Sequence, residues 1–306
     1  MEFNPDYVLR HDFAAKGTVK NMNNLTDIKY VRELLQRHGF SFSKGLGQNF
    51  LINPSVCPKI AELGNAREGF GILEIGTGIG TLTAELAKRA DKVVAIEIDG
   101  RLLPVLEETL SDFDNIKVIN DDIMKVNLKQ IIEDEFAGLK LAVCANLPYY
   151  LTSPIIMMLL ENNLPIESIT VMVQKEAAQR LCAQVGTRMS GAITVAVNYY
   201  GNAESLFNVS RGSFMPAPNV DSAVIRITIN REKRILDAED EKFFFSIVRA
   251  AFSQRRKTLA NSVSSMLGIP KENIYHALNE LDINESIRAE QMSMENMLAL
   301  SKRLKG

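Results

Sequence analysis

The stretch that decides the fold is GILEIGTGIGTLTAELAKRADKVVAIEID, which runs from Gly71 to Asp99. It begins with a strand-like run, Gly71–Ile75, and continues through glycines at positions 76, 78 and 80. A helical pattern over Thr81–Arg89 and a second strand-like run, Lys92–Ile98, follow. Glycines let the backbone turn sharply and approach a ligand closely, and the N-terminus of the helix beyond them favours a negative group. The stretch therefore predicts a strand, a ligand-binding turn, a helix and a second strand.

The same alternation of strands and helices continues along the chain. Further strand-like runs are Ile116–Ile119, Leu139–Ala145 and Ser168–Val173, and further helical patterns are Asp27–His38, Arg101–Leu110, Leu128–Phe136 and Ser153–Glu161. Strands that alternate with helices predict a parallel sheet covered on both faces, an α/β fold of the Rossmann-like type. Two later segments, Ala192–Tyr200 and Ser222–Ile229, have β character and are expected to form an antiparallel pair at the edge of the sheet.

Three regions are expected along the chain. Residues 1–21 lack a clear periodicity and Met22 offers a second possible start, so we interpret the first 21 residues as a disordered upstream extension or cloning remnant. Residues 22–235 carry the alternation and form the predicted catalytic domain. After a charged linker, residues 236–306 contain helical patterns only and predict a small helical C-terminal domain.

Composition narrows the classes of function. Apolar residues make up 46% and charged residues 24% of the 306 positions, which is typical of a globular protein of about two domains. The sequence has neither a long uncharged apolar run nor a signal pattern, so neither a membrane span nor export is predicted. The three cysteines and three histidines are scattered. This indicates a reduced, cytoplasmic protein without a metal site or a Ser–His–Asp triad.

The glycine-rich turn and the acidic residues after it suit one class of ligand. The spacing Glu-x-Gly-x-Gly-x-Gly from Glu74 differs from the Gly-x-Gly-x-x-Gly of nicotinamide sites and fits the amino-acid end of S-adenosylmethionine better than a pyrophosphate. Glu97 ends the next strand, where a carboxylate accepts hydrogen bonds from ribose hydroxyls. Asp122 follows the third strand and would bind an adenine amino group, with Ile123 packed on the ring. The structural alternatives are a plain strand-to-helix turn at the glycines and, for either acid taken alone, a solvated residue at a strand end.

A short motif after the fourth strand carries the predicted chemistry. An exocyclic adenine nitrogen is a poor nucleophile, and two acceptors on its N–H groups would make its lone pair available. The side-chain oxygen of Asn146 and the carbonyl of Leu147 are the expected acceptors, and Pro148 would hold Leu147 extended. Tyr149 offers a stacking face for an extruded base, and Phe214 would stack on its other side. The structural alternatives are a plain Asn-x-Pro turn and a phenylalanine that caps the core.

One cluster of basic residues stands out on a chain whose net charge is −2. The segment Lys242–Lys271 contains six basic residues and no acid, and Arg255, Arg256 and Lys257 are consecutive within it. Phosphate contacts from such a cluster supply salt-dependent affinity for nucleic acid. We therefore predict RNA binding here, although a solvated helical face would have the same composition.

The motifs together resemble the small-subunit ribosomal RNA adenine N6,N6-dimethyltransferases, the kasugamycin-sensitivity enzymes. The resemblance extends over nearly everything between Gly45 and Ser262. The stretches that carry it are, in order, LGQNFL (46–51), EIGTGIGTLT (74–83), AIEID (95–99), NDDI (120–123), NLPYYLTSPI (146–155), FMPAPNVDSAV (214–224) and AFSQRRKTLANS (251–262). Thr77 is a departure, because the family usually has proline there.

The resemblance implies a function and a set of site residues. The expected reaction is dimethylation of two adjacent adenosines in the 3′-terminal hairpin of small-subunit (16S) rRNA, with S-adenosylmethionine as donor, on an assembling small subunit. The residues implied to bind the donor are Asn49, Leu51, Gly76, Gly78, Glu97, Asp122, Ile123 and Asn146. The residues implied to form the base pocket are Asn146, Leu147, Pro148, Tyr149 and Phe214.

Two other functions stay open at this point. A macrolide-resistance type of methyltransferase, which modifies an adenine of large-subunit rRNA, shares the donor turn and the Asn-x-Pro-Tyr core. A non-catalytic RNA-binding assembly factor would keep the fold without the reaction. The near-neutral charge and the stretches NLPYYLTSPI and AFSQRRKTLANS favour the small-subunit enzyme, which is expected to be monomeric.

Overall fold

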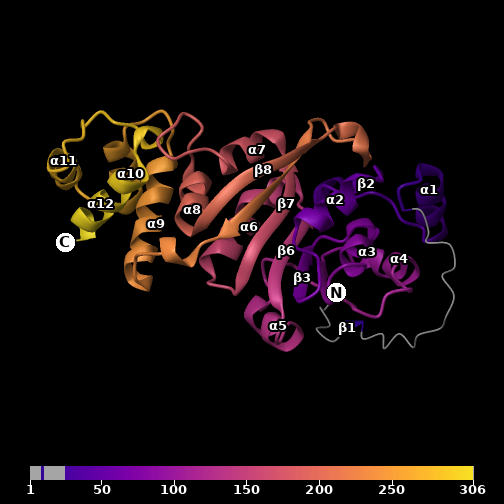
Figure 1. Cartoon of the computed structure of the whole chain (residues 1–306). Helices are drawn as coiled ribbons and strands as arrows, with labels where there is room; N and C mark the ends of the chain where they lie inside the picture. Colours follow the sequence, from indigo (N-terminus) through magenta and orange to yellow (C-terminus); the bar gives the residue numbers. More distant parts are fainter. Residues whose placement is uncertain (1–7, 10–24, 306) are drawn as a thin grey trace, which may run out of the picture. The chain divides into compact units, whose positions relative to one another are not determined.

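The computed structural model describes residues 8–9 and 25–305, and within it the chain divides into two compact units (Figure 1). The first, here called the sheet unit, contains the described residues up to Ala178 together with Ser205–Thr228. The second, the helical unit, contains Gln179–Glu204 and the residues from Ile229 onward. Residues 179–204, which the sequence placed within the predicted catalytic domain, are thus grouped with the helical unit. The interpretation of residues 1–21 lies outside the described residues, except that Val8–Leu9 form a short strand.

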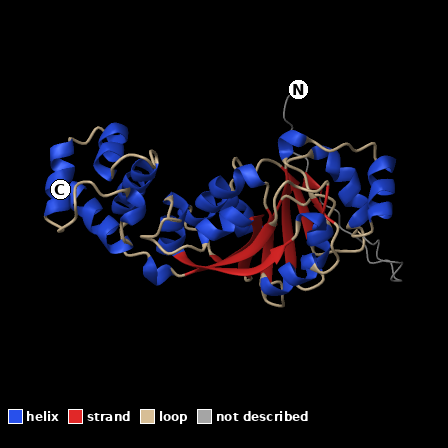
Figure 2. Cartoon of the chain, turned by 90° about the horizontal axis from the view of Figure 1, so that it is seen from above, coloured by secondary structure: helices blue, strands red, loops and turns tan. Residues whose placement is uncertain are grey.

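A mixed sheet forms the centre of the sheet unit, and helices flank it (Figure 2). Its order within the described residues is β1-β5-β4-β3-β6-β7-β10-β8. The strands are β1 (Val8–Leu9), β3 (Phe70–Ile75), β4 (Lys92–Glu97), β5 (Ile116–Asn120), β6 (Lys140–Asn146), β7 (Ile166–Gln174), β8 (Gly201–Val209) and β10 (Ser222–Ile229). The five strands from β5 to β7 are parallel, while β1 and β10 run antiparallel to their neighbours β5 and β7. The predicted α/β fold is confirmed.

The strand order places the turns that follow β3 and β6 next to each other. From β3 the chain builds outward to β4 and β5 on one side, and then returns to place β6 and β7 on the other side. In such a sheet, ligands bind beyond the carboxyl ends of the strands at the point where the order reverses. That point is at β3, between β4 and β6.

The helices of the sheet unit pack on apolar strand faces. They are α1 (Ile28–Arg37), α2 (Val56–Leu63), α3 (Thr81–Ala87), α4 (Leu103–Thr109), α5 (Leu128–Glu135) and α6 (Thr152–Glu161), and α7 (Lys175–Leu181) leads out of the unit. One core cluster joins α2 and α3 to the sheet through Ile60, Leu86 and Ile72, and a second lies beneath α1 and α4. All six residues of β3 are buried, as expected of a parallel strand covered on both faces.

Short elements complete the structure. A separate two-stranded ladder pairs β2 (Phe50–Leu51) with β9 (Phe214–Met215). The 3₁₀ turns are η1 (Lys44–Leu46), η2 (Gly100–Leu102), η3 (Tyr149–Leu151), η4 (Arg211–Ser213), η5 (Arg231–Lys233) and η6 (Ala289–Gln291).

One predicted element was wrong. Ala192–Tyr200 forms helix α8 and not a strand, so the expected pairing with Ser222–Ile229 does not exist. The side chain of Thr194 accepts a hydrogen bond from the backbone N–H of Gly191 (3.0 Å), which closes the first turn of the helix. Most of the segment is buried, so its apolar side chains show no period that separates helix from strand. Strand β10 instead lies between β7 and β8.

The helical unit combines α8 with four C-terminal helices, as the sequence predicted for its last part. These are α9 (Ala238–Phe252), α10 (Leu259–Leu267), α11 (Lys271–Asn279) and α12 (Met294–Lys305). At the start of α9 the buried carboxylate of Glu241 accepts hydrogen bonds from Arg234 (2.6 and 2.8 Å) and from the hydroxyls of Tyr199 (3.2 Å) and Tyr200 (2.9 Å). Across the part of the chain that the structure describes, every helix is too short or too polar to cross a bilayer.

Candidate active site

The turns after three neighbouring strands of the sheet unit meet around one small cavity. Its volume is about 90 Å³, and it lies where β3, β4 and β6 end. Its lining residues are Leu46, Gly47, Gln48, Asn49, Phe50, Gly76, Gly78, Glu97, Ile98, Leu102, Asn146, Leu147, Pro148 and Tyr149. The structure therefore brings together eight of the predicted residues from four separate segments of the sequence.

A larger cavity of about 370 Å³ lies elsewhere in the sheet unit. Residues of α2, α3 and the end of α4 line it, including Cys57, Thr81 and Thr109. None of the predicted site residues lines this cavity. We therefore place the site at the smaller cavity, where the strand ends carry the acidic and amide side chains.

The turn after β3 needs glycine at two positions for different reasons. Gly76 has φ +76° and Gly78 has φ +55°, conformations that other residues rarely adopt. A Cβ atom on Gly78 would lie 3.0 Å from Cδ1 of Phe50, so a side chain there would displace that ring. A Cβ atom on Gly76 would meet nothing within 4 Å. The backbone of Gly76 thus leaves room for a ligand to approach it.

Glu97 is buried at the end of β4, with an exposed fraction of 5%. Its Oε2 accepts hydrogen bonds from the N–H of Thr77 (2.9 Å), the hydroxyl of Thr77 (2.9 Å) and the N–H of Gly78 (3.2 Å). Its Oε1 accepts one, from the N–H of Asp99 (2.9 Å). Burial raises the pKa of Glu97, and these four hydrogen bonds oppose that rise. Oε1 keeps a lone pair for a further donor.

Asn146 is held in one orientation at the end of β6. Its Nδ2 donates a hydrogen bond to the backbone carbonyl of Asn49 (3.2 Å). Because the nitrogen has this acceptor, the side-chain oxygen Oδ1 is the atom left to accept a hydrogen bond. Pro148, next but one, has φ −60° and ψ 130°, so the chain is extended where it leaves the strand.

Tyr149 begins the turn η3, and its hydroxyl is 2.7 Å from that of Ser222 on β10. Burial raises the pKa of Tyr149, so its phenol is neutral at physiological pH. Contact with Ser222 at the far end of the side chain fixes the ring, which lines the cavity.

Four predicted residues do not line this cavity. Leu51 and Phe214 face each other across the β2–β9 ladder and are 4% and 3% exposed. Oδ1 of Asp122 accepts a hydrogen bond from the N–H of Met124 (3.0 Å), and Ile123 is buried. The roles suggested for these four residues stay predictions.

The structure adds residues that the sequence analysis did not select. Gln48, Phe50, Ile98 and Leu102 also line the cavity. Ile98 follows Glu97 directly and is 51% exposed. An apolar residue at the solvent-facing end of a buried strand was a signal that could have identified it.

The basic cluster lies in the helical unit, in the turn between α9 and α10. Arg255, Arg256 and Lys257 are exposed, and no described residue forms an ion pair with any of them. Nη2 of Arg255 donates to the carbonyls of Arg188 (3.3 Å) and Ser190 (3.5 Å). Three cations without acidic partners on one turn form a surface that can contact phosphates.

The described residues contain no group of three histidine, cysteine, aspartate or glutamate side chains that could hold a metal ion.

Comparison with known proteins identifies the family. Residues 39–305 match the family model described as "Ribosomal RNA adenine dimethylase". The chain belongs to this family. It is 49% identical over 278 residues to the ribosomal RNA small subunit methyltransferase A of Geobacillus sp. (strain WCH70), which covers 90% of this chain and 95% of the relative. It is 45% identical over 280 residues to the protein of the same name from Clostridioides difficile (strain 630), with 92% and 96% covered.

Solved structures agree with this assignment. A dimethyladenosine transferase from Plasmodium falciparum has a TM-score of 0.67 at 26% identity and covers 82% of this chain and 95% of its own. The 23S rRNA methyltransferase ErmE has a TM-score of 0.61 at 28% identity, with 84% and 100% covered. The chain is therefore a methyltransferase that uses S-adenosylmethionine, and the family and the enzyme class predicted from the sequence are confirmed.

Proposed function

We propose that this protein dimethylates N6 of two adjacent adenosines in the 3′-terminal hairpin of small-subunit rRNA, on an assembling small subunit in the cytoplasm. The orientation of Asn146 carries the proposal. Its Nδ2 is bound to the carbonyl of Asn49, so its Oδ1 is left as an acceptor beside the glycine-rich turn and Glu97. An acceptor at that place suits an amine that must be made nucleophilic next to a methyl donor.

The residues around the cavity fit S-adenosylmethionine, which supplies an electrophilic methyl group when bound. The backbone at Gly76 has open space in front of it, where any side chain would project. Glu97 Oε1 can accept one more hydrogen bond, as a ribose hydroxyl requires. Asn49 and Gly78 complete this wall of the site. Leu51, Asp122 and Ile123 are proposed to contact the donor from outside the cavity.

Asn146 and Leu147 would activate the target amine. Oδ1 of Asn146 and the carbonyl of Leu147 accept its two N–H groups, which draws the lone pair out of conjugation with the ring. The nitrogen then forms a bond to the methyl carbon as the carbon–sulfur bond breaks, and the methylated nitrogen loses a proton to water. Catalysis would come from positioning of the reactants and from electrostatic stabilisation, and no side chain of this site needs to act as a strong base.

Tyr149 would hold the extruded base by stacking, and Pro148 braces the turn that presents it. Phe214 is proposed as the second stacking partner. The protein is proposed to bind rRNA as a monomer, with phosphate contacts from Arg255, Arg256 and Lys257.

The second candidate function is methylation of large-subunit rRNA. The structural similarity to ErmE, a 23S rRNA methyltransferase, at 28% identity is the observation in its favour. The small-subunit relatives match at 44–49% identity over at least 90% of this chain, which favours the first proposal.

Methyl transfer to isolated subunits tests both functions. Small subunits that lack the modification and large subunits would be incubated with labelled donor, and the methylated nucleotides mapped by mass spectrometry. We expect dimethyladenosine in the small subunit only. Asn146→Ala is expected to abolish transfer while donor affinity, measured by calorimetry, largely survives. Label in the large subunit, or normal turnover by Asn146→Ala, would overturn the proposal.

A further inference from the structure

The segment Phe40–Phe50, here called the strap, connects the acid-bearing end of β4 to Asn146. We propose that Gln48 and Asp99 are positioning residues, which hold the strap so that the carbonyl of Asn49 fixes the amide of Asn146. The inference rests on the proposed role of Asn146 in activating the base. It gives a function in this reaction to Asp99, which does not line the cavity, and to its hydrogen-bond partner Gln48, which does.

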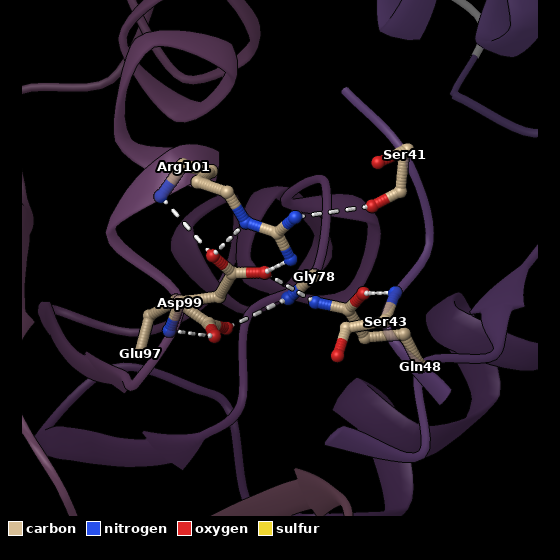
Figure 3. A network of polar contacts seen from close by, with 7 residues as sticks. All are labelled: Ser41, Ser43, Gln48, Gly78, Glu97, Asp99 and Arg101. Atoms are coloured by element: carbon tan, nitrogen blue, oxygen red, sulfur yellow. Dashed lines mark hydrogen bonds and ion pairs between the residues drawn. The ribbon is translucent and has the colours of Figure 1, made fainter. Parts of the chain in front are cut away.

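Asp99 is the anchor on the sheet side (Figure 3). Its side chain is 6% exposed, and its Oδ2 accepts hydrogen bonds from Nε2 of Gln48 (2.7 Å) and Nη2 of Arg101 (2.6 Å). Nε of Arg101 donates to Oδ1 of the same carboxylate (2.8 Å). The N–H of Asp99 donates to Oε1 of Glu97 (2.9 Å). The anchor is thus rigid and continuous with the wall of the donor site.

Gln48 and Arg101 tie two parts of the strap to that anchor. Oε1 of Gln48 accepts a hydrogen bond from the N–H of Ser43 (2.9 Å), and Nη1 of Arg101 donates to the carbonyl of Ser41 (3.4 Å), as Figure 3 shows. The guanidinium of Arg101 also lies 5.2 Å from the ring centroid of Phe40, within the range of a cation–π contact. Several weak contacts that act on one segment hold it better than any single one would.

The strap in turn holds the side-chain amide of Asn146 in its orientation. Asn49 follows Gln48 directly, and its carbonyl accepts the hydrogen bond from Nδ2 of Asn146 (3.2 Å). The side chain of Asn49 donates in turn to the carbonyl of Gly47 (3.0 Å), which stiffens the turn on both sides of Gln48. If Gln48 loses its bond to Asp99, the carbonyl of Asn49 shifts. The amide of Asn146 can then rotate, which would present N–H in place of Oδ1 to the target amine.

Exchanging the amide and the acid between positions 48 and 99 tests this coupling. Gln48→Glu alone places two carboxylates in contact and removes the donor, so the strap loses its anchor. Adding Asp99→Asn lets the amide of residue 99 donate to the carboxylate of residue 48. Because Gln48 and Nη2 of Arg101 bind the same oxygen of Asp99, the new carboxylate at position 48 also replaces Asp99 as the anionic partner of Arg101. At saturating donor and small subunits, we expect Gln48→Glu to lower kcat by roughly tenfold or more, and the double variant to recover most of that loss.

The matched control is the same swap on helix α5, where Nε2 of Gln130 donates to Oδ1 of Asp134 (2.9 Å) on an exposed face. Gln130→Glu and its double variant with Asp134→Asn are expected to leave kcat unchanged. Thermal unfolding of all variants shows whether a loss of kcat merely follows a loss of stability.

A second readout does not depend on activity. The side-chain amide signal of Asn146 in a ¹⁵N-labelled protein, assigned by its absence in Asn146→Ala, is expected to move in Gln48→Glu and to return in the double variant. An unmoved signal together with unchanged kcat, or a loss of both that the swap does not repair, would overturn the inference. If the wild-type protein fails to methylate small subunits, the proposed function falls, and the amide signal still decides whether Gln48 and Asp99 orient Asn146.

Discussion

Replacing Glu74 by glutamine is expected to remove a pH dependence from the stability of the sheet core. Glu74 lies on β3 just before the glycine-rich turn, and its side chain is completely buried. Neither carboxylate oxygen has a hydrogen-bond partner among the described residues. The hydroxyl of Thr83 lies nearby and offsets only part of the cost of burial, so burial raises the pKa of Glu74 to about 8.

The size of the effect follows from proton linkage. The unfolded chain titrates near the ordinary pKa of 4.5, so between that pH and 8 the native state holds one proton that the unfolded state lacks. Stability therefore falls as pH rises through this range, and the loss is complete above the native pKa. Between pH 6 and 8.5 the loss amounts to about 2.5 kcal/mol, or roughly a 70-fold increase in the opening equilibrium of the core. Glutamine keeps the size of the side chain and has no proton to lose.

Two buried cysteines can report how often the core of the sheet unit opens to solvent. Cys57 and Cys144 are buried in the cluster on the same face of the sheet, and Glu74 contributes to raising the pKa of both thiols. In a Cys182→Ser background, the rate at which a thiol reagent labels them, divided by the rate in denatured protein at the same pH, gives the opening equilibrium. We expect protection to fall with pH in the parent protein and to stay nearly level in Glu74→Gln.

A carboxylate whose pKa is lowered, and not raised, in the folded protein serves as the control. Glu135 pairs with Lys92 and Lys117, and its pKa is lowered despite the desolvation that opposes this. It is fully ionised in both states above pH 6, so Glu135→Gln should leave the slope of protection against pH as it is in the parent. If the parent and Glu74→Gln lose protection in parallel as pH rises, Glu74 is not a neutral acid in the folded protein and the reasoning is refuted.

Three other variants test the site, the basic turn and the helical unit. Glu97→Ala should weaken binding of S-adenosylhomocysteine by roughly 10-fold to 100-fold, measured by calorimetry, because a hydrogen bond to a charged group is lost; unchanged affinity would remove Glu97 from the donor site. Neutralising Arg255 and Arg256 together should make the plot of log K against log salt for subunit binding shallower by about 1.4 to 1.8, and an unchanged slope would mean that neither contacts phosphate. Glu241→Gln should lower the free energy of unfolding by about 3 kcal/mol, because Arg234 loses its buried partner. Burial and the Glu241 carboxylate hold the pKa of Tyr199 at about 12, so the same change should lower that pKa in an ultraviolet titration of the phenols.

The local sequence was sufficient to predict a strand or helix wherever the hydrophobic pattern of a segment agrees with its burial in the structure. The strands β3, β4 and β6 are short apolar runs, of which the first leads into Gly76 and the other two end at Glu97 and Asn146. The order of the elements therefore also predicted which residues meet beyond the strand ends. The prediction for Ala192–Tyr200 was wrong because its β-branched and aromatic residues favour a strand locally, whereas burial within the helical unit decides its structure. Helix α2 was not identified from the sequence; its Pro58 lies in the first turn, where a helix tolerates proline.

The contacts behind the site were beyond the reach of sequence reasoning. Gln48 and Asp99 are 51 positions apart, and no periodicity or motif states that their side chains meet. The same holds for the ladder that buries Leu51 against Phe214, which are distant in the chain. Such pairings depend on how turns pack once the sheet has formed, which is a tertiary property.

The interleaving of the two units affects how the chain folds during translation. Residues 179–204, which belong to the helical unit, leave the ribosome before β10 does, although β10 pairs with β7 over seven positions. Until Ser222–Ile229 have emerged, the edge of β7 that later pairs with β10 has no partner strand. Unpaired strand edges can associate with other chains. A nascent chain paused near Gly201 is therefore expected to need a chaperone, and a C-terminal truncation at the start of α9 would remove only part of the helical unit.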